Sequence, residues 1–195
     1  MTNDGLRILV IDDNRLRASV IEDGLREAGY RHLTVVTETD ALLRSIVDSD
    51  PDMIFIDLGN PNRDSLEAAF AVSRAVRRPI AMFVDHSDMA AMTASIDAGV
   101  SAYIVDGLRK ERVKPILDLA IARFNAFSRL QRELEETRSA LAERKIIERA
   151  KGILMRNKGV SEQDAYDLLR KSAMRQNRKL AEVAEGLTLA AGLLE

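Results

Sequence analysis

Residues 6–14 read LRILVIDDN, an apolar run that ends in two aspartates and an asparagine. A run this short, rich in β-branched residues and bounded by turn-forming residues, is typical of a buried β-strand. Four similar runs follow in the first half of the chain: Thr34–Val36, Met53–Ile56, Ile80–Val84 and Ala102–Val105. Apolar residues at helical spacing lie between the runs, and Gly29 and Gly99 stand where left-handed helix C-caps are expected. This alternation predicts an α/β fold with a five-stranded, doubly wound parallel sheet.

The second half of the chain carries no strand pattern and predicts helices only. Helical spacing starts near Lys110, and no Pro or Gly lies between Pro115 and Gly152. Side chains within this helix recur at alternating steps of three and four, which is coiled-coil spacing: Phe127, Leu130, Leu134, Thr137 and Leu141. One interpretation is a single amphipathic helix packed inside a monomer. We favour a parallel dimer, since a long exposed helix has no core to lie against unless a second copy supplies one.

Two further helices are predicted after the long one. Ser161 can cap the first of them by accepting a hydrogen bond from the third helical amide, with Asp164 in place of the usual Glu of a capping box. The apolar faces of the two helices are Ala165, Leu168, Leu169 and Ala173, then Leu180, Val183, Ala184 and Leu187. With the end of the long helix they predict a small three-helix bundle.

Composition excludes several classes of protein. The chain has 195 residues, 46% of them apolar and 31% charged, which is enough for real cores and excludes general disorder. It has no cysteine, which excludes a disulfide framework, a thiolate zinc site and a cysteine nucleophile. Its two histidines, His32 and His86, are far apart in the sequence, so we expect neither a histidine metal site nor a Ser-His-Asp triad. No apolar run reaches the roughly 18 residues of a spanning helix and no secretory signal is evident, so we expect a cytoplasmic protein without a membrane partner.

The net charge of −2 hides an uneven distribution. Residues 1–127 carry 15 Lys/Arg against 20 Asp/Glu, whereas residues 128–195 carry 14 against 11. Between Arg144 and Lys179 the balance reaches 11 basic against 4 acidic residues. A basic segment joined to an acidic half indicates an anionic partner for the second half, although a solvated helical face has the same composition.

Carboxylates follow two of the predicted strands. Asp12 and Asp13 end the first strand, and Asp57 ends the third. Parallel strands bring such residues to one edge of the sheet, where carboxylates repel one another unless a cation lies among them. Oxygen ligands of this kind suit Mg²⁺, and a carboxylate beside the metal can act as a nucleophile toward phosphorus. Turn and N-cap chemistry also explains Asp12-Asp13-Asn14 alone, but the pairing with Asp57 favours a functional site.

The first half resembles the receiver domain of bacterial response regulators in two motifs, Leu9-Val-Ile-Asp12-Asp13 and Ile54-Phe-Ile-Asp57, with Pro61 four residues further on. The resemblance covers about residues 6–122 and implies a (βα)5 fold. It implies that Asp57 is the phosphoacceptor and that Mg²⁺ is held by the carboxylates of Asp12, Asp13 and Asp57 and the carbonyl of Gly59. Tyr103 falls at the family's switch aromatic.

Two positions depart from the receiver pattern. Val84, in Phe83-Val84-Asp85, stands where receivers usually carry the Thr or Ser whose hydroxyl binds the phosphoryl oxygen. Asp106, in Asp106-Gly107, replaces the family's Lys, so an anion stands where a cation would pair with the phosphoryl group. Adding a dianion to a pocket of carboxylates is electrostatically unfavourable. We therefore predict that phosphorylation is not the main trigger.

The second half resembles the ANTAR domain, which is named after transcription antitermination regulators. The match covers about residues 130–191, with a coiled-coil linker helix over 123–143. It rests on Arg144-Lys-Ile-Ile-Glu-Arg-Ala-Lys-Gly152-Ile-Leu-Met155, then Ser161-Glu162, Ala165-Tyr166, Ala173-Met174 and Val183-Ala184. The whole chain is similar to antiterminators of the AmiR/NasT type. That resemblance implies binding of leader-RNA hairpins, which blocks a terminator and lets RNA polymerase continue, in control of nitrate assimilation. The resemblance implies control either by a kinase or by a ligand-sensing partner protein, and the departures at Val84 and Asp106 favour a partner that senses nitrate or nitrite.

Basic residues of the second half are the predicted RNA contacts: Arg144, Lys145, Arg149, Lys151, Arg175, Arg178 and Lys179, with Arg170 and Lys171 beside them. RNA loops are bound by phosphate contacts and by stacking on aromatic or guanidinium planes. Tyr166 is the only aromatic residue after Phe127, so stacking would fall to arginine. Gly152 inside a predicted helix costs about 1 kcal/mol relative to Ala, which indicates a packing or contact reason for it.

Two other functions fit parts of the sequence. A DNA-binding phosphorelay response regulator is the main alternative, because helices near 162–175 and 179–190 could imitate a helix-turn-helix. The basic residues gather on the first bundle helix and at the bundle corner, and not along one recognition helix, which favours RNA. A phosphatase that uses Asp57 is the other alternative, but the missing hydroxyl and lysine argue against phosphoryl transfer. We predict a regulator and not an enzyme.

Overall fold

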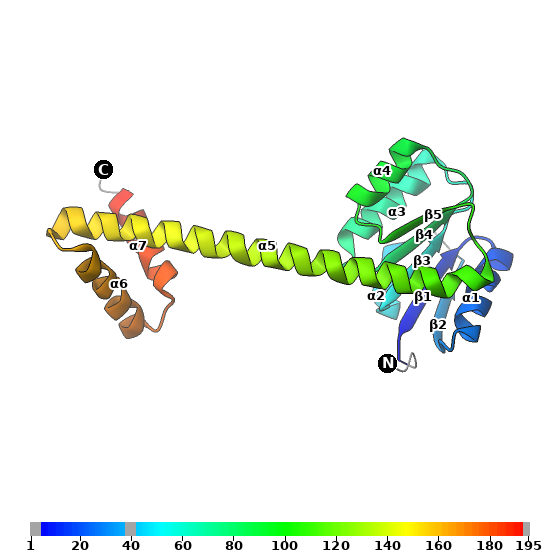
Figure 1. The fold of residues 1–195 in the computed structure, drawn as a ribbon, viewed down its shortest axis with the longest axis horizontal. Coiled ribbons are helices and arrows are strands. Elements are labelled where there is room, and N and C mark those ends of the chain that lie inside the picture. The colour runs from blue at the N-terminus through cyan, green and yellow to red at the C-terminus, as the bar shows by residue number, and fades with distance from the viewer. Residues whose placement is uncertain (1–4, 38–41, 193–195) are drawn as a thin grey trace. The chain divides into compact units, whose positions relative to one another are not determined.

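The computed structural model describes residues 5–37 and 42–192, and the chain divides into two compact units, Met1–Ser128 and Arg129–Glu195. Figure 1 labels the elements of both units. One helix, α5 (Lys110–Lys158), contributes residues to each unit. Across the described part of the chain, none of the helices is long and apolar enough to cross a membrane.

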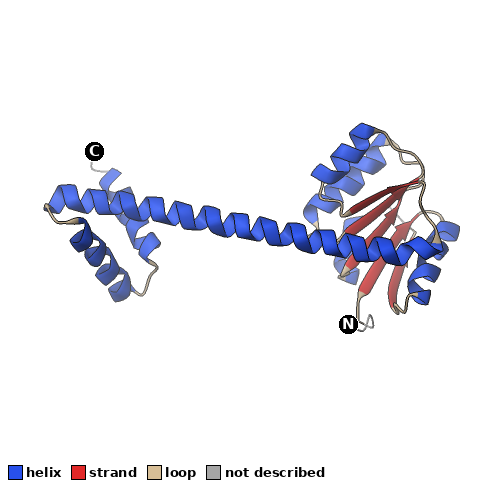
Figure 2. Cartoon of the chain, viewed as in Figure 1, coloured by secondary structure: helices blue, strands red, loops and turns tan. Residues whose placement is uncertain are grey.

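The first unit is a five-stranded parallel sheet with strand order β2-β1-β3-β4-β5. The strands are β1 (Arg7–Asp12), β2 (His32–Val36), β3 (Met53–Asp57), β4 (Ile80–Val84) and β5 (Ala102–Val105). The helices between them are α1 (Arg15–Glu27), α2 (Leu42–Ser49), α3 (Arg63–Ala75) and α4 (Met89–Asp97). Helices lie on both faces of the sheet (Figure 2), which confirms the predicted doubly wound fold.

Both faces of the sheet are buried, which explains why its strands are continuous apolar runs. Successive side chains point to opposite faces, so Ile8 and Val10 enter one core while Leu9 and Ile11 enter the other. The first core is completed by α1 and the start of α5, and the second by α2 and α3. Because the two cores cover both faces of the sheet, its polar residues lie at the carboxyl ends of the strands.

Helix ends in the first unit follow the sequence signals. The Asn14 side chain caps α1 by accepting a hydrogen bond from the Leu16 amide at 3.0 Å. Gly29 and Gly99 have φ of +92° and +81°, which confirms the predicted left-handed positions after α1 and α4. The cap at Asn14 fixes where α1 begins, directly beside the end of β1.

The second unit is a small bundle made by the end of α5, α6 (Glu162–Gln176) and α7 (Leu180–Gly192). Its buried centre consists of Ala150, Leu169 and Ala184, one residue from each helix. Two of these are alanines, so Leu169 is the large side chain of this buried cluster. The predicted cap is confirmed, since Ser161 Oγ accepts from the Asp164 amide at 3.1 Å.

Candidate functional site

The acidic pocket lies at the carboxyl ends of β1 and β3, where the strand order reverses. Parallel pairing places Asp12 directly opposite Asp57, and both residues are buried. Asp85 joins them from the residue after β4 and is more exposed. Asp13 is also exposed, on the turn between β1 and α1. The structure therefore brings together two of the three carboxylates named in the sequence and adds Asp85.

The cation of this pocket is Arg17, which the sequence analysis missed. Its guanidinium Nη2 lies 2.6 Å from Asp57 Oδ1, and Nη1 lies 3.3 Å from Asp85 Oδ2. Nε lies 3.8 Å from Asp12 Oδ2. Its position in the sequence offered a signal, because a residue in the first turn of a helix that follows β1 lies beside the carboxyl edge of the sheet. One guanidinium thus forms ion pairs with three carboxylates.

Gly59, two residues after the end of β3, lies next to the Arg17 guanidinium. Its φ is +57°, a conformation that favours glycine, and its amide donates to Asp57 Oδ1 at 2.9 Å. Its carbonyl, the predicted metal ligand, accepts from the Asp85 amide at 2.6 Å. A Cβ at this position would overlap the Arg17 guanidinium. The left-handed turn favours glycine here, and any larger residue would also displace the Arg17 guanidinium.

Burial dominates the electrostatics of the two inner carboxylates. It raises the pKa of Asp12 to about 7, against the hydrogen bond from the Asn14 amide. It also raises the pKa of Asp57, where the Gly59 amide and Arg17 oppose the effect. Asp12 Oδ2 and Arg17 Nε have no hydrogen-bond partner among the described residues. A single positive charge therefore compensates the buried acids only in part.

The predicted Mg²⁺ ligands do not fit a metal ion in this arrangement. Within residues 5–37 and 42–192, no group of three or more His, Cys, Asp or Glu side chains is placed to hold one. Asp13 is exposed, and the guanidinium of Arg17 contacts one of the two carboxylate oxygens of Asp57. Arg17 thus lies among these carboxylates where a metal ion would have to bind.

The predicted switch positions lie beside the pocket. Val84 is buried at the end of β4, so an apolar side chain fills the site where receivers usually place a hydroxyl. Asp106 is exposed, with a left-handed φ of +46°. The hydroxyl of Tyr103, which is half-buried on β5, lies 2.9 Å from that of Ser87.

A basic face runs along the last turns of α5, formed by Lys145, Arg149, Gly152 and Arg156. These positions are four, three and four residues apart, so they share one side of the helix. The three charged residues are exposed, whereas Ala150 lies in the bundle core. Arg144 is exposed next to this face. Arg156 is not among the predicted RNA contacts, although the helical spacing alone would have found it.

Lys151 lies apart from the basic face. Its side chain is only 9% exposed, and its ammonium lies 2.8 Å from Glu148 and 2.6 Å from Glu162. These two carboxylates raise the pKa of Lys151. The predicted RNA contact at Lys151 therefore does not agree with its position, and the residue instead joins α5 to α6.

Gly152 has no packing role in the bundle that the structure describes. Apart from its own helix, no atom lies within 4 Å of the place where a Cβ would stand. The packing reason that we expected for a helical glycine is therefore not found within this chain.

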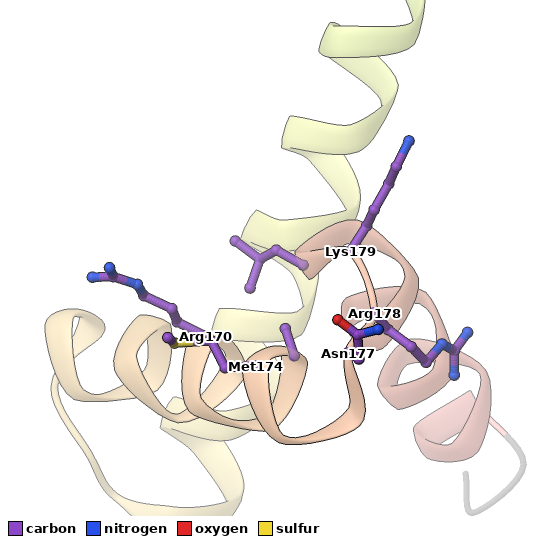
Figure 3. A pocket seen from close by; sticks show the side chains of 7 residues that line it. Arg170, Met174, Asn177, Arg178 and Lys179 are labelled. Atoms are coloured by element: carbon purple, nitrogen blue, oxygen red, sulfur yellow. The ribbon is translucent and has the colours of Figure 1, made fainter.

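The corner between α6 and α7 carries a hollow of about 430 Å³. Arg170, Arg178 and Lys179 stand around it, and their side chains point away from one another (Figure 3). Arg178 pairs with Glu182 at 3.1 Å, and Arg175 is exposed nearby. Cations that diverge in this way suit an extended anion better than a single small one.

The predicted dimerisation residues lie on an uncovered stretch of α5. Every residue from 129 to 145 is exposed. The large apolar side chains of the stripe are each 50–60% exposed: Phe127, Leu130, Leu134 and Leu141. No described residue of this chain buries them.

Comparison with known families explains the two units. The model of the response regulator receiver domain matches residues 8–118, and that of the ANTAR domain matches residues 135–187. The chain belongs to the response regulators that carry an ANTAR domain. The transcriptional regulatory protein PdtaR of Mycobacterium tuberculosis is 28% identical to this response regulator over 179 residues, 92% of this chain and 87% of that protein.

Two other similarities concern parts of this ANTAR response regulator. A nitrate regulatory protein of Klebsiella oxytoca is 38% identical over 74 residues, 38% of this chain and 19% of that protein. The receiver domain of a modulated diguanylate cyclase from Desulfovibrio desulfuricans G20 superimposes with a TM-score of 0.53 at 20% identity, over 62% of this chain and 97% of that domain. The structural similarity shows the receiver fold alone.

Proposed function

We propose that this response regulator is a transcription antiterminator that binds hairpin loops of leader RNA through its ANTAR domain. The observation that carries the proposal is the basic face of α5, in which exposed cations flank Gly152, where an added Cβ would meet no atom of another described element within 4 Å. Missing side-chain volume between cations lets a phosphate backbone approach the helix closely. RNA held in this way cannot form the competing terminator, so RNA polymerase continues.

The α6–α7 corner supports the same ligand. Arg175, Arg178 and Lys179 add positive charge there. The side chains of Arg170, Arg178 and Lys179 diverge (Figure 3), which suits an extended polyanion such as RNA. Tyr166 is exposed and is the only aromatic residue after Phe127 in the sequence, so stacking on bases falls mainly to the arginines. The similarity to the nitrate regulatory protein supports nitrate or nitrite assimilation genes as the target.

Matched ligands test RNA against DNA. Gel shifts with an RNA hairpin pair and with a DNA duplex of equal charge, each over a salt series, should show tighter binding of the RNA. Preference for the duplex would replace the proposal by the DNA-binding alternative.

We further propose that a ligand-sensing partner protein, responsive to nitrate or nitrite, controls the receiver domain in the cytoplasm. Val84 offers no hydroxyl to a phosphoryl group, Asp106 repels one, and Arg17 already contacts the predicted phosphoacceptor, Asp57. A pull-down with the purified protein, from extracts of nitrate-starved and nitrate-fed cells, tests this control. We expect one partner whose capture depends on nitrate.

Phosphorylation should not accumulate on Asp57. After incubation with Mg²⁺ and a small phosphodonor, we expect the intact mass of the wild-type protein to stay unchanged, because the dianion would enter a pocket of acids. A stable mass increase that disappears in Asp57→Asn would contradict this prediction.

A dimer should form through the apolar stripe of α5, with a second copy of this chain as the occupant. Heptad spacing favours pairing with a second helix of the same sequence, because the apolar stripes of the two helices would then meet along one seam. Leu134→Asp places a charge in the seam and should give a monomer in analytical ultracentrifugation with RNA present. Ser139→Asp, on the opposite side of the same helix, is the matched control and should remain dimeric. Equal masses for both variants would show that the stripe does not pair.

A further inference from the structure

The Arg17 guanidinium reaches every carboxylate of the receiver pocket. Nη2 bonds to Asp57 at 2.6 Å, Nη1 to Asp85 at 3.3 Å, and Nε lies 3.8 Å from Asp12. Its side chain is only 26% exposed. We propose that Arg17 is the resident cation of the acidic pocket and that it excludes divalent metal ions from it.

Arg17 and a divalent ion compete for the same oxygens. Mg²⁺ binds carboxylate oxygens at about 2.0–2.1 Å in a nearly octahedral shell. Asp57 Oδ1 already accepts from Arg17 and from the Gly59 amide, so its lone pairs on the pocket side are engaged. A metal at this oxygen would also place two positive charges next to a third, in a partly buried setting where charges interact strongly. The guanidinium must leave before a metal can enter.

The surroundings of Arg17 are built for a planar guanidinium. Gly59 leaves the space that a Cβ would fill, and its amide holds Asp57 in place beneath the guanidinium. The cap at Asn14 starts α1 so that its first turn brings Arg17 to the ends of β3 and β4. Arg17 therefore ties three elements of the sheet edge together without an ion from solution.

Substitution of Arg17 should convert the pocket into a metal site. Without metal, Arg17→Gln leaves Asp12, Asp57 and Asp85 uncompensated and should lower Tm by several degrees. Millimolar Mg²⁺ should restore Tm, because a ligand that binds only the folded state stabilises it. Mn²⁺ titration of the full-length chain, followed by electron paramagnetic resonance, should show one bound ion in Arg17→Gln and at least tenfold weaker binding in the wild type.

Arg15→Gln is the matched control, since Arg15 is an exposed arginine on the same helix. It should behave like the wild type in both measurements. Equal Mn²⁺ affinity of wild type and Arg17→Gln would overturn the proposal, and so would the absence of binding to both. If Arg17→Gln does not fold, Arg17→Lys keeps a shorter cation and should bind Mn²⁺ with intermediate affinity. RNA is absent from these assays, so this proposal can fail without affecting the proposed function.

Discussion

Arg149→Ala should weaken binding of a leader-RNA hairpin by about 10- to 150-fold at moderate salt, since a charge-assisted hydrogen bond contributes roughly 1.5–3 kcal/mol. Loss of one phosphate contact should also flatten the slope of log affinity against log salt concentration by about 0.7–0.9. Arg149 is exposed and lies outside the bundle core, so circular dichroism should remain helical. Filter binding across a salt series measures both effects.

Two variants separate RNA contact from other effects of charge. Arg132→Ala removes an exposed arginine of the same helix, outside the basic face, and should leave both affinity and slope unchanged. Lys151→Ala breaks the ion pairs to Glu148 and Glu162. It should lower the melting temperature of the bundle and leave the salt slope nearly unchanged. Wild-type binding by Arg149→Ala at every salt concentration would show that the basic face is only a solvated surface.

Leu169→Ala should destabilise the C-terminal bundle by about 3 kcal/mol, within the range for a buried leucine. Leu169 is 3% exposed and packs with Ala150 and Ala184, so it supplies the largest side chain of a very small core. A bundle with few buried residues has little stability in reserve. Hydrogen exchange of the α6 and α7 amides should therefore accelerate by more than a hundredfold, while the amides of the sheet keep their protection.

Leu168→Ala provides the matched comparison, because Leu168 is the preceding residue of α6 and is 38% exposed. It should change amide exchange by less than tenfold. Similar acceleration in both variants would mean that the bundle is not centred on Leu169.

The sheet and the location of the acidic pocket follow from local sequence patterns. Each strand is a short apolar run because both faces of the sheet are covered, and parallel strands end at the same edge. Asp12 and Asp57 therefore had to lie close together, and their register in the sheet confirms this. The family resemblance added the names of the two domains, which both family models confirm.

Long-range ion pairs could not be predicted in the same way. Arg17 is 40 residues from Asp57 in the sequence, and 68 from Asp85. The ion pairs of Lys151 were equally hard to predict, because in the sequence this lysine looks like the exposed basic residues around it. Its position between the core side of α5 and the basic face decides that it pairs with Glu162. Composition counts a charge but does not say which group it meets.

Because of the Arg17 contacts, the effect of a single substitution in this pocket depends on which residue is replaced first. If Arg17 were lost first, Asp12, Asp57 and Asp85 would lose the cation that they share, and the stability of the fold would come to vary with metal in the medium. If Asp57 were lost first, Arg17 would still pair with Asp85. Asp57 is thus easier to replace than Arg17, because Arg17 is the cation that lies near all three carboxylates among the described residues.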